Sequence, residues 1–514
     1  MIDLIDKRFN QSSTSSLLVL LLSTTICFWL VRIFKHPLKQ IPGPIESKLG
    51  FDFILKFHEI KGTRTQYIHK LHRRFGSVVR VGKNEVSVTD RMAIKMIYSN
   101  TAAFPKDMQM YHAMQFDPAH PGVFNMSNKQ DHSTRRRLIA PAFSKQNLDN
   151  QIDYIIHKVE HIVKKLEKSI NDNNESVVVD WLIQWRLFTA DVVVRAVFGQ
   201  DLKMTEDDQV HPFIKDVDSS LMLSIMKNAF GLGYKLVDQL SRLLPRNWSL
   251  HKIMTSQDRA YYQFAKPMVE NYAADVGHDA TLKEVVSRLL GGLKTRNGVN
   301  EMRDVVAESI NLLVAGIDTT STTITYAIWR TLTTEHVRQS VFKELESVFP
   351  SIDSPPTLTE LEKLPVLTSI IQETLRLHSA APATLPRVCK DGMVINGEDD
   401  AYVFIPPGTT VGAQAYTVHR DVNLWGPDAD EWKPQRWQNV TDDQEQSMRP
   451  FSTGPTDCLG QNMAWTEMYM ALAFTLRFFK GRLADDFTDN DMAPLDWFLL
   501  VPKGHACRMR IENA

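Results

Sequence analysis

The amino-acid sequence predicts a mainly α-helical fold with small β-sheets, preceded by a single N-terminal transmembrane helix. Apolar residues recur at helical spacing through most of the chain, whereas strand-like runs occur only near the two ends of the folded part. The expected helices lie around 150–170, 178–200, 258–275, 302–333, 335–348, 358–378 and 461–480, and the expected strands at 77–81, 85–88 and 402–405. No fixed period repeats along the chain, which excludes a solenoid.

The composition is that of one large folded unit. The chain has 514 residues, 43% hydrophobic and 23% charged, and no linker or low-complexity tract divides it after the first fifty residues. A net charge of -1 argues against a main partner that is a nucleic acid. The four cysteines lack the close spacing of a zinc site or a disulfide framework, so a cysteine with a special role acts singly.

Residues 17–34 form an apolar segment long enough for a membrane helix. The segment carries one charge, Arg32, and leads into Lys35 and Lys39 instead of a small-residue cleavage site, which favours an anchor over a signal peptide or a buried helix. Because basic residues follow the segment, the positive-inside rule places the rest of the chain in the cytosol. The expected organisation is a short lumenal N-terminus at 1–16, a transmembrane anchor at 17–34, a proline-rich hinge at 35–50 and a folded domain at 51–514.

The strongest chemical signal is the loop Phe451-Ser-Thr-Gly454-Pro-Thr-Asp-Cys458-Leu-Gly460, just before an expected helix. A cysteine at a helix N-terminus lies among unpaired amide donors and the positive end of the dipole, which favours a thiolate and so a metal ligand. Gly454 and Gly460 would let the backbone approach a flat cofactor, and Phe451 would cover the sulfur from water. A purely structural cysteine is the alternative interpretation.

The spacing Phe-x-x-Gly-x-x-x-Cys-x-Gly resembles the haem-ligand loop of the cytochrome P450 family. The likeness extends from the Pro-Gly-Pro hinge to about residue 506, and the chain looks most like fungal microsomal members. The resemblance implies that 51–514 is a haem-thiolate catalytic domain with the P450 fold. It also implies haem b as the cofactor, with the Cys458 thiolate as the axial ligand of the iron.

Glu373 and Arg376 stand three residues apart, which places opposite charges on one helix face. Taken alone, such a pair is typical of a surface salt bridge. It resembles the Glu-x-x-Arg motif of the family, and the resemblance implies that Arg436 completes a buried structural network behind the cysteine loop.

Between 310 and 325 an apolar helix carries an acid and several hydroxyl groups. One interpretation is that the threonines bond back to helix carbonyls while Asp318 lies at the surface. The run resembles the oxygen-binding helix of the family. The resemblance implies that Ala315 and Gly316 make room above the iron and that Thr319, with Asp318, relays protons to bound dioxygen.

The resemblance also assigns the cations that hold the haem propionates. Arg387 and Arg136 match two arginines of the family, and guanidinium forks suit carboxylates. His132 stands where the family has tryptophan, and its ring nitrogen can still donate a hydrogen bond. Thr456 stands where the family usually has arginine or histidine, so we expect one propionate contact to be weaker or to come from elsewhere.

The chain lacks a Gly-x-Gly-x-x-Gly motif after a strand, so its electrons come from a separate donor. The resemblance implies NADPH-cytochrome P450 reductase, with cytochrome b5 as a further candidate, at the endoplasmic reticulum membrane. Arg135 and Arg137 flank Arg136 and either face that acidic partner or form a solvated basic face.

By the same resemblance, an adaptable apolar pocket holds the substrate. Its expected residues are Met108, Met110, Met114, Phe116, Phe124, Met222, Met226, Leu312, Leu313, Ala383 and Leu385. The expected activity is hydroxylation or another oxidation of an apolar small molecule with O2 and electrons from NADPH, in fungal terpenoid or polyketide biosynthesis. A fatty-acid or xenobiotic hydroxylase is the alternative. A haem-thiolate isomerase or dehydratase and a non-catalytic haem sensor are the alternatives of a different type.

Overall fold

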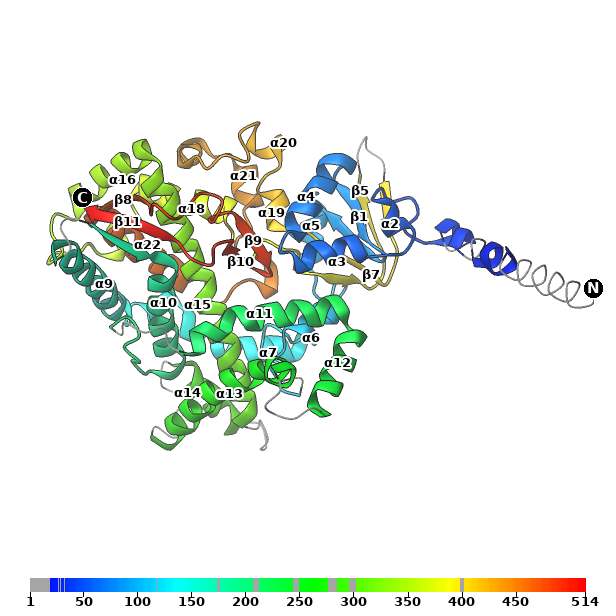
Figure 1. Cartoon of the computed structure of the whole chain (residues 1–514), viewed down its shortest axis with the longest axis horizontal. Coiled ribbons are helices and arrows are strands. Elements are labelled where there is room, and N and C mark those ends of the chain that lie inside the picture. Colours follow the sequence, from blue (N-terminus) through cyan, green and yellow to red (C-terminus); the bar gives the residue numbers. More distant parts are fainter. Residues whose placement is uncertain are drawn as a thin grey trace, which may run out of the picture.

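The structure, a computed structural model, describes residues 19–25, 27, 29–31, 33–117, 119–172, 176–206, 212–243, 249–275, 284–294, 302–397 and 402–514. Its described part is a mainly helical body with four small sheets, which confirms the expected fold class. Figure 1 shows a large helical region on one side and a smaller region, in which strands and helices mix, on the side where the N-terminal segment leaves.

The helical body is built around α15 (Met302–Thr333), which packs against α10 (Trp181–Phe198) and α22 (Gln461–Phe478). α10 begins where the Asp180 side chain accepts a hydrogen bond from a backbone N–H and ends at Gly199, a left-handed residue with φ +68°. Around them lie α7 (Lys129–Ile139), α8 (Lys145–Leu148), α9 (Ile152–Asp172), α11 (Pro212–Phe230), α12 (Leu232–Leu243), α13 (Ser249–Asp275), α14 (Val285–Lys294), α16 (Glu335–Val348), α17 (Leu358–Leu361) and α18 (Pro365–Leu377).

The smaller region is built on a sheet of order β1-β2-β7-β4. β2 pairs in parallel with β7, and the other two pairs are antiparallel. Its strands are β1 (Val78–Gly82), β2 (Glu85–Val88), β4 (Arg387–Cys389) and β7 (Thr409–Gly412), with the hairpin β5 (Met393–Asn396) and β6 (Tyr402–Ile405) beside them. Its helices are α2 (Ile45–Lys48), α3 (Phe53–Ile60), α4 (Arg64–Phe75), α5 (Arg91–Ser99) and α6 (Met108–Ala113).

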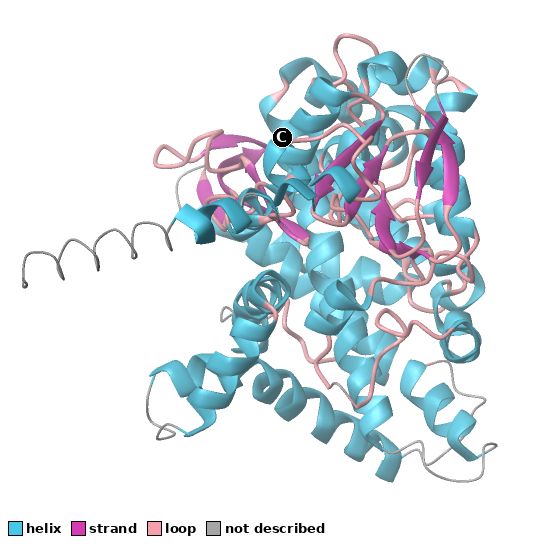
Figure 2. Ribbon diagram, turned by 90° about the vertical axis from the view of Figure 1, so that its right-hand side faces the viewer, coloured by secondary structure: helices cyan, strands magenta, loops and turns pink. Residues whose placement is uncertain are grey.

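The C-terminal part adds two further small sheets and the loop that precedes α22. The strands are β3 (Val177–Asp180), β8 (Phe479–Leu483) and β11 (Arg508–Asn513) in one sheet and β9 (Pro494–Trp497) with β10 (Leu499–Pro502) in the other. Figure 2 shows that the strands gather in the upper half of that view while helices fill the lower half. The short elements of this part are α19 (Ala415–Val418), α20 (Val422–Trp425), α21 (Asp442–Ser447), η3 (Pro434–Asn439) and η4 (Gly454–Thr456), and η1 (Ala140–Phe143) follows α7.

The expected helices are confirmed with two corrections. Residues 178–180, expected to begin a helix, belong to β3, and α10 begins only at Trp181. The segment 358–378 is not a single helix, because it divides into α17 and α18. Pro365 is the first residue of α18, where its missing N–H leaves no helix hydrogen bond unmade, and proline restricts the residue before it to extended backbone. The expected strands are confirmed as β1, β2 and β6.

The segment predicted to be the anchor is helical at 19–25, 27, 29–31 and 33–35. The rest of 17–34, and all of 1–16, lies outside the described residues. Within the part of the chain that the structure describes, no helix combines the length and the apolar character that crossing a membrane requires.

Candidate active site

The cysteine loop connects η4 to α22 and turns back on itself. The backbone N–H of Cys458 donates to the Phe451 carbonyl at 3.0 Å, and that of Asp457 donates to the Gly454 carbonyl at 3.1 Å. Gly454 has φ +78°, and a Cβ at this position would lie 2.6 Å from the Tyr98 carbonyl oxygen. Backbone conformation and close approach therefore both require glycine here.

Cys458 lies just before α22, whose N-cap is Gly460. The side chain of Cys458 is exposed, and the nearest atom to a Cβ built on Gly460 would be the Cys458 sulfur at 4.0 Å, so the space beside the sulfur is open. Burial within the protein nevertheless raises the pKa of the thiol, and the Gly460 N–H and Arg136 only oppose this shift. A metal ion bound by the sulfur would lower this pKa.

Lys106, His132 and Arg387 come from three separate segments, and the Arg387 charge lowers the pKa of the other two. Lys106 is buried, and its ammonium donates to the Phe124 carbonyl at 2.6 Å. Burial and the nearby Arg387 lower the pKa of Lys106 to about 7. Burial, with the charges of Lys106, Arg136 and Arg387, lowers the pKa of His132 to about 4, so its ring is neutral at pH 7. Among the described residues, neither Lys106 nor Arg387 forms an ion pair with a carboxylate.

Two arginines predicted to bind propionates also hold the cysteine loop. Arg136 donates to the Asp457 carbonyl oxygen at 2.7 Å and forms an ion pair with the Asp457 carboxylate. Arg387 donates from Nη2 to the Thr456 hydroxyl at 2.7 Å, whereas its Nε is buried and has no hydrogen-bond partner within the described ranges. Thr456 therefore orients Arg387. The sequence analysis missed the other buried cation, Lys106, because no motif surrounds it.

Ala315 and Thr319 lie one turn apart on α15 and share a face. Ala315 is exposed within a largely buried helix, and the Thr319 hydroxyl donates to its carbonyl at 2.6 Å. Gly316 differs, because a Cβ there would lie 2.5 Å from Val193 Cγ2 of α10. Close packing of α15 on α10 therefore explains the glycine, in place of the expected room above an iron atom.

Asp318 is buried and faces α10. Its carboxylate lies 2.9 Å from Arg186 Nε, and only 3% of the Asp318 side chain is exposed. The interpretation that places Asp318 at the surface is therefore wrong. The sequence analysis missed Arg186, which lies more than 130 positions before its partner and belongs to no recognisable motif.

The structure brings together the three side chains of the network expected around Glu373. The Glu373 carboxylate and the Arg376 guanidinium are both fully buried and make two hydrogen bonds of 2.8 Å, and Arg436 Nε donates to the same carboxylate at 2.9 Å. Two donors were not expected: Trp437 Nε1 at 3.0 Å and the backbone N–H of Lys433 at 2.8 Å. The carboxylate thus accepts five hydrogen bonds from four groups.

His419 connects this network to the cysteine loop. Burial lowers the pKa of His419 to about 3, so its ring is neutral. Nδ1 donates to the Arg376 carbonyl at 3.0 Å, and Nε2 accepts from the backbone N–H of Arg449 at 2.9 Å, two residues before Phe451. Two hydrogen bonds of His419 therefore link Arg376 to the backbone just before the cysteine loop.

Arg135 does not face a partner or solvent. Its guanidinium is buried and pairs with Glu308 at 3.1 Å and with Asp304 at 3.3 Å, both on α15. Glu308 also accepts from the backbone N–H of Val123 at 2.9 Å. Both interpretations proposed for Arg135 are thus wrong, and the side chain instead joins α7 and the preceding loop to α15.

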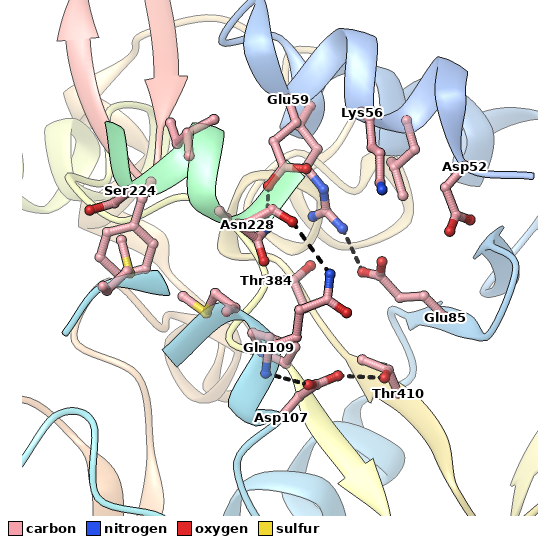
Figure 3. Close-up of a pocket in the computed structure, with 18 of the residues that line it drawn as sticks. Asp52, Lys56, Glu59, Glu85, Asp107, Gln109, Ser224, Asn228, Thr384 and Thr410 are labelled. Carbon is pink, nitrogen blue, oxygen red and sulfur yellow. Dashed lines mark hydrogen bonds and ion pairs between the residues drawn. The ribbon is translucent and has the colours of Figure 1, made fainter. Parts of the chain in front are cut away.

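A cavity of about 260 Å³ lies between α3, β2, α6 and α11 (Figure 3). Three residues predicted to border the substrate, Met110, Met114 and Ala383, line it. Leu313 is instead fully buried in the core. The other lining residues are mostly polar or charged. This cavity therefore differs from the apolar pocket that was expected.

The side chains present fit a haem group. Lys106 and Arg387 are buried cations without a carboxylate partner in the described ranges, and neutral His132 is a further donor beside them. Two propionate groups would supply the missing negative charge. The open space beside the Cys458 sulfur and the exposed face at Ala315 suit a flat group between the loop and α15.

The fold and this donor set define a class of protein, the haem-thiolate monooxygenases, and comparison with known proteins agrees. The family model described as Cytochrome P450 matches residues 44–508. The chain therefore belongs to the cytochrome P450 family, is a haem-thiolate monooxygenase, and uses haem b with an axial cysteine thiolate.

Relatives from fungi match along nearly the whole chain. Cytochrome P450 monooxygenase tazI of Aspergillus terreus is 27% identical over 97% of this chain and 98% of its own length. Benzoate 4-monooxygenase bphA of Aspergillus niger is 26% identical over 94% of this chain and 95% of its own. Averantin hydroxylase of Dothistroma septosporum is 27% identical, with 93% and 86% covered.

Proposed function

We propose that this monooxygenase is anchored in the endoplasmic reticulum membrane, receives electrons from NADPH-cytochrome P450 reductase and hydroxylates an apolar small molecule of fungal secondary metabolism. The single observation that carries the site assignment is the pair of buried, unneutralised cations Lys106 and Arg387 beside the loop of Cys458. Two of the relatives are named for the small organic molecule that they oxidise, which supports a small-molecule substrate.

Each side chain has a distinct role in this proposal. Cys458 would hold the haem iron through its sulfur, and Arg136, Arg387, Lys106 and His132 would bind the two propionates. When bound, haem b supplies the electron-transfer and oxygen chemistry. The network around Glu373 keeps the loop rigid, so that the sulfur stays in position without reorganisation.

Proton delivery belongs to the exposed face of α15. The Thr319 hydroxyl, fixed by the Ala315 carbonyl at 2.6 Å, holds a proton at this face. Asp318, held by Arg186 in the structure, takes up a proton from solvent when its carboxylate leaves the guanidinium, and the resulting carboxylic acid passes that proton to Thr319. Arg186 is thus a positioning residue.

The membrane proposal rests on exposed apolar side chains. Val19, Leu20, Leu21, Leu22, Leu30, Val31 and Phe34 of the N-terminal helical segment are 46% to 69% exposed. Exposed apolar side chains also occur on α3 and α12, which lie on the side where this segment leaves the body (Figure 1). We expect the full chain to sediment with membranes and to resist alkaline extraction. Release by alkali would contradict the anchor.

Reconstitution with the reductase tests the activity. A monooxygenase oxidises NADPH only when both reductase and substrate are present and forms an oxygenated product. An isomerase or dehydratase converts its substrate without either, and a sensor binds ligand without turnover. Turnover that needs neither NADPH nor reductase would therefore overturn the proposal.

A further inference from the structure

The cavity between α3, β2, α6 and α11 is lined by a small group of apolar side chains and a larger group of charged ones. Met110, Met114, Ala383 and Phe498 are among the apolar lining residues. Most of the charged lining residues come from α3, the turn before β2 and the start of α4. Figure 3 shows Lys56 and Glu59 of α3 and Glu85 of β2 among the side chains around the cavity.

Carboxyl groups outnumber cations in this cavity. Among the described residues that line it, the carboxyl groups are Asp52, Glu59, Glu85, Asp107 and Asp496, and the cations are Lys56, Arg64 and Lys83. Three of these acids surround one arginine. Glu85 pairs with Arg64 at 2.6 Å, and at Glu59 and Asp496 the Arg64 charge partly opposes the rise in pKa that burial causes. One guanidinium neutralises one carboxylate, so this cluster carries excess negative charge.

Burial opposes that excess charge. It raises the pKa of Glu59 despite Arg64 and the hydrogen bond from Asn228, and it raises the pKa of Asp496 to about 6. The Thr384 hydroxyl, on a residue only 6% exposed, also lines the cavity and has no hydrogen-bond partner within the described ranges. A ligand with a positive charge would relieve the repulsion among the acids, and a polar atom on it would satisfy Thr384.

We propose that this cavity selects the substrate by charge: it accepts an apolar molecule that carries a cationic group, and it disfavours a carboxylate. The cation lies among Glu59, Glu85 and Asp496, and the apolar part packs against Met110 and Met114. This inference rests on the proposed function, because it assigns this cavity to the substrate of that reaction.

Three probes with the same ten-carbon chain test the selection in the haem-loaded full chain: decyltrimethylammonium, decanol and decanoate, each below its micelle concentration. The quaternary nitrogen has no lone pair and therefore does not ligate iron. Calorimetric titration at pH 7.5 is expected to show that the cation binds about tenfold more tightly than the alcohol and that the carboxylate binds most weakly. Equal affinities, or tightest binding of decanoate, would overturn the proposal.

Substitutions show which residues cause the preference for the cationic probe. Glu59→Gln keeps an acceptor for Asn228 but removes one charge, so the preference for the cation should fall several-fold, and Lys56→Gln should increase it. Asp443→Asn removes a carboxylate that pairs with Arg91 at the surface and should change nothing. An unchanged preference in both cavity variants overturns the inference. The carbon monoxide spectrum and turnover with reductase test the proposed function separately, since neither depends on this charge.

Discussion

Two buried charge clusters of this protein differ in how far their positive and negative charges balance. Around Glu373, one carboxylate accepts from two guanidinium groups, an indole and a backbone amide, and the Arg376 charge is shared with further carbonyl oxygens. Around Lys106 and Arg387, burial and the Arg387 charge lower the pKa of Lys106, and the described residues provide neither cation with an ion-pair partner. The first cluster is complete within the chain, whereas the second is completed only by an anionic ligand.

The difference shows how a structural site is distinguished from a binding site. A buried polar group is costly unless it is paired, so a folded chain leaves such a group unpaired chiefly where a ligand supplies the partner. The acidic cavity follows the same principle with the opposite sign, because its acids exceed its cations.

The largest expected effect follows from breaking the balanced cluster. Glu373→Ala leaves the buried guanidinium of Arg376 without its carboxylate, and we expect the free energy of unfolding to fall by about 3–5 kcal/mol. Urea unfolding followed by circular dichroism measures this loss. Glu335→Ala, which breaks an exposed pair with Arg338, is the control and should leave the unfolding midpoint unchanged. A similar small effect for both variants would mean that the network is not structural.

The next effect concerns proton delivery. Thr319→Ala should retain haem and NADPH oxidation, but product formation should fall by roughly 100-fold while hydrogen peroxide is released, because the positioned hydroxyl is lost. Thr323→Ala is a matched control, since that hydroxyl donates to a helix carbonyl one turn further along, at 2.9 Å. Fully coupled turnover in Thr319→Ala would rule out this role.

Removing a cation from the unbalanced cluster should weaken haem binding. Lys106→Met is expected to lose haem to an acceptor apoprotein about tenfold faster, whereas Lys145→Met, at an exposed pair with Glu362, should not. If Lys106 held no propionate, its removal would relieve repulsion with Arg387 and the haem would not be lost faster.

Lys106 should also make the affinity for haem depend on pH. Burial and the neighbouring Arg387 lower the pKa of Lys106 to about 7, with Arg136 adding to the shift and Glu308 opposing it. Because propionate binding favours the charged form, haem uptake above pH 7 takes up a proton, and haem affinity should fall as the pH rises through 7. Stopped-flow haem uptake at pH 6 to 9 measures this trend, which should disappear in Lys106→Met.

The smallest expected effect concerns Thr456. Thr456→Ala removes one hydrogen bond to Arg387, worth about 1 kcal/mol, so haem should dissociate a few-fold faster. If the rate stayed at the wild-type value, Thr456 would not orient Arg387.

The sequence predicted those parts of the site whose residues lie close together in the chain. The Cys458 loop and the pair Glu373–Arg376 each lie within one short segment, so their spacing could be matched to motifs of the family. It did not predict Arg186 beside Asp318, or Lys106, because contacts between distant segments leave no local pattern. The long helices were predicted for the same reason: their apolar periodicity is local.

The carbon monoxide difference spectrum of the reduced full chain shows whether Cys458 holds the haem iron. We expect the strongly red-shifted Soret band of thiolate-ligated haem in the wild type and its loss in Cys458→Ala, with the fold retained. A folded, haem-loaded wild-type protein without the shifted band, or a Cys458→Ala variant that keeps it, would show that Cys458 is not the ligand.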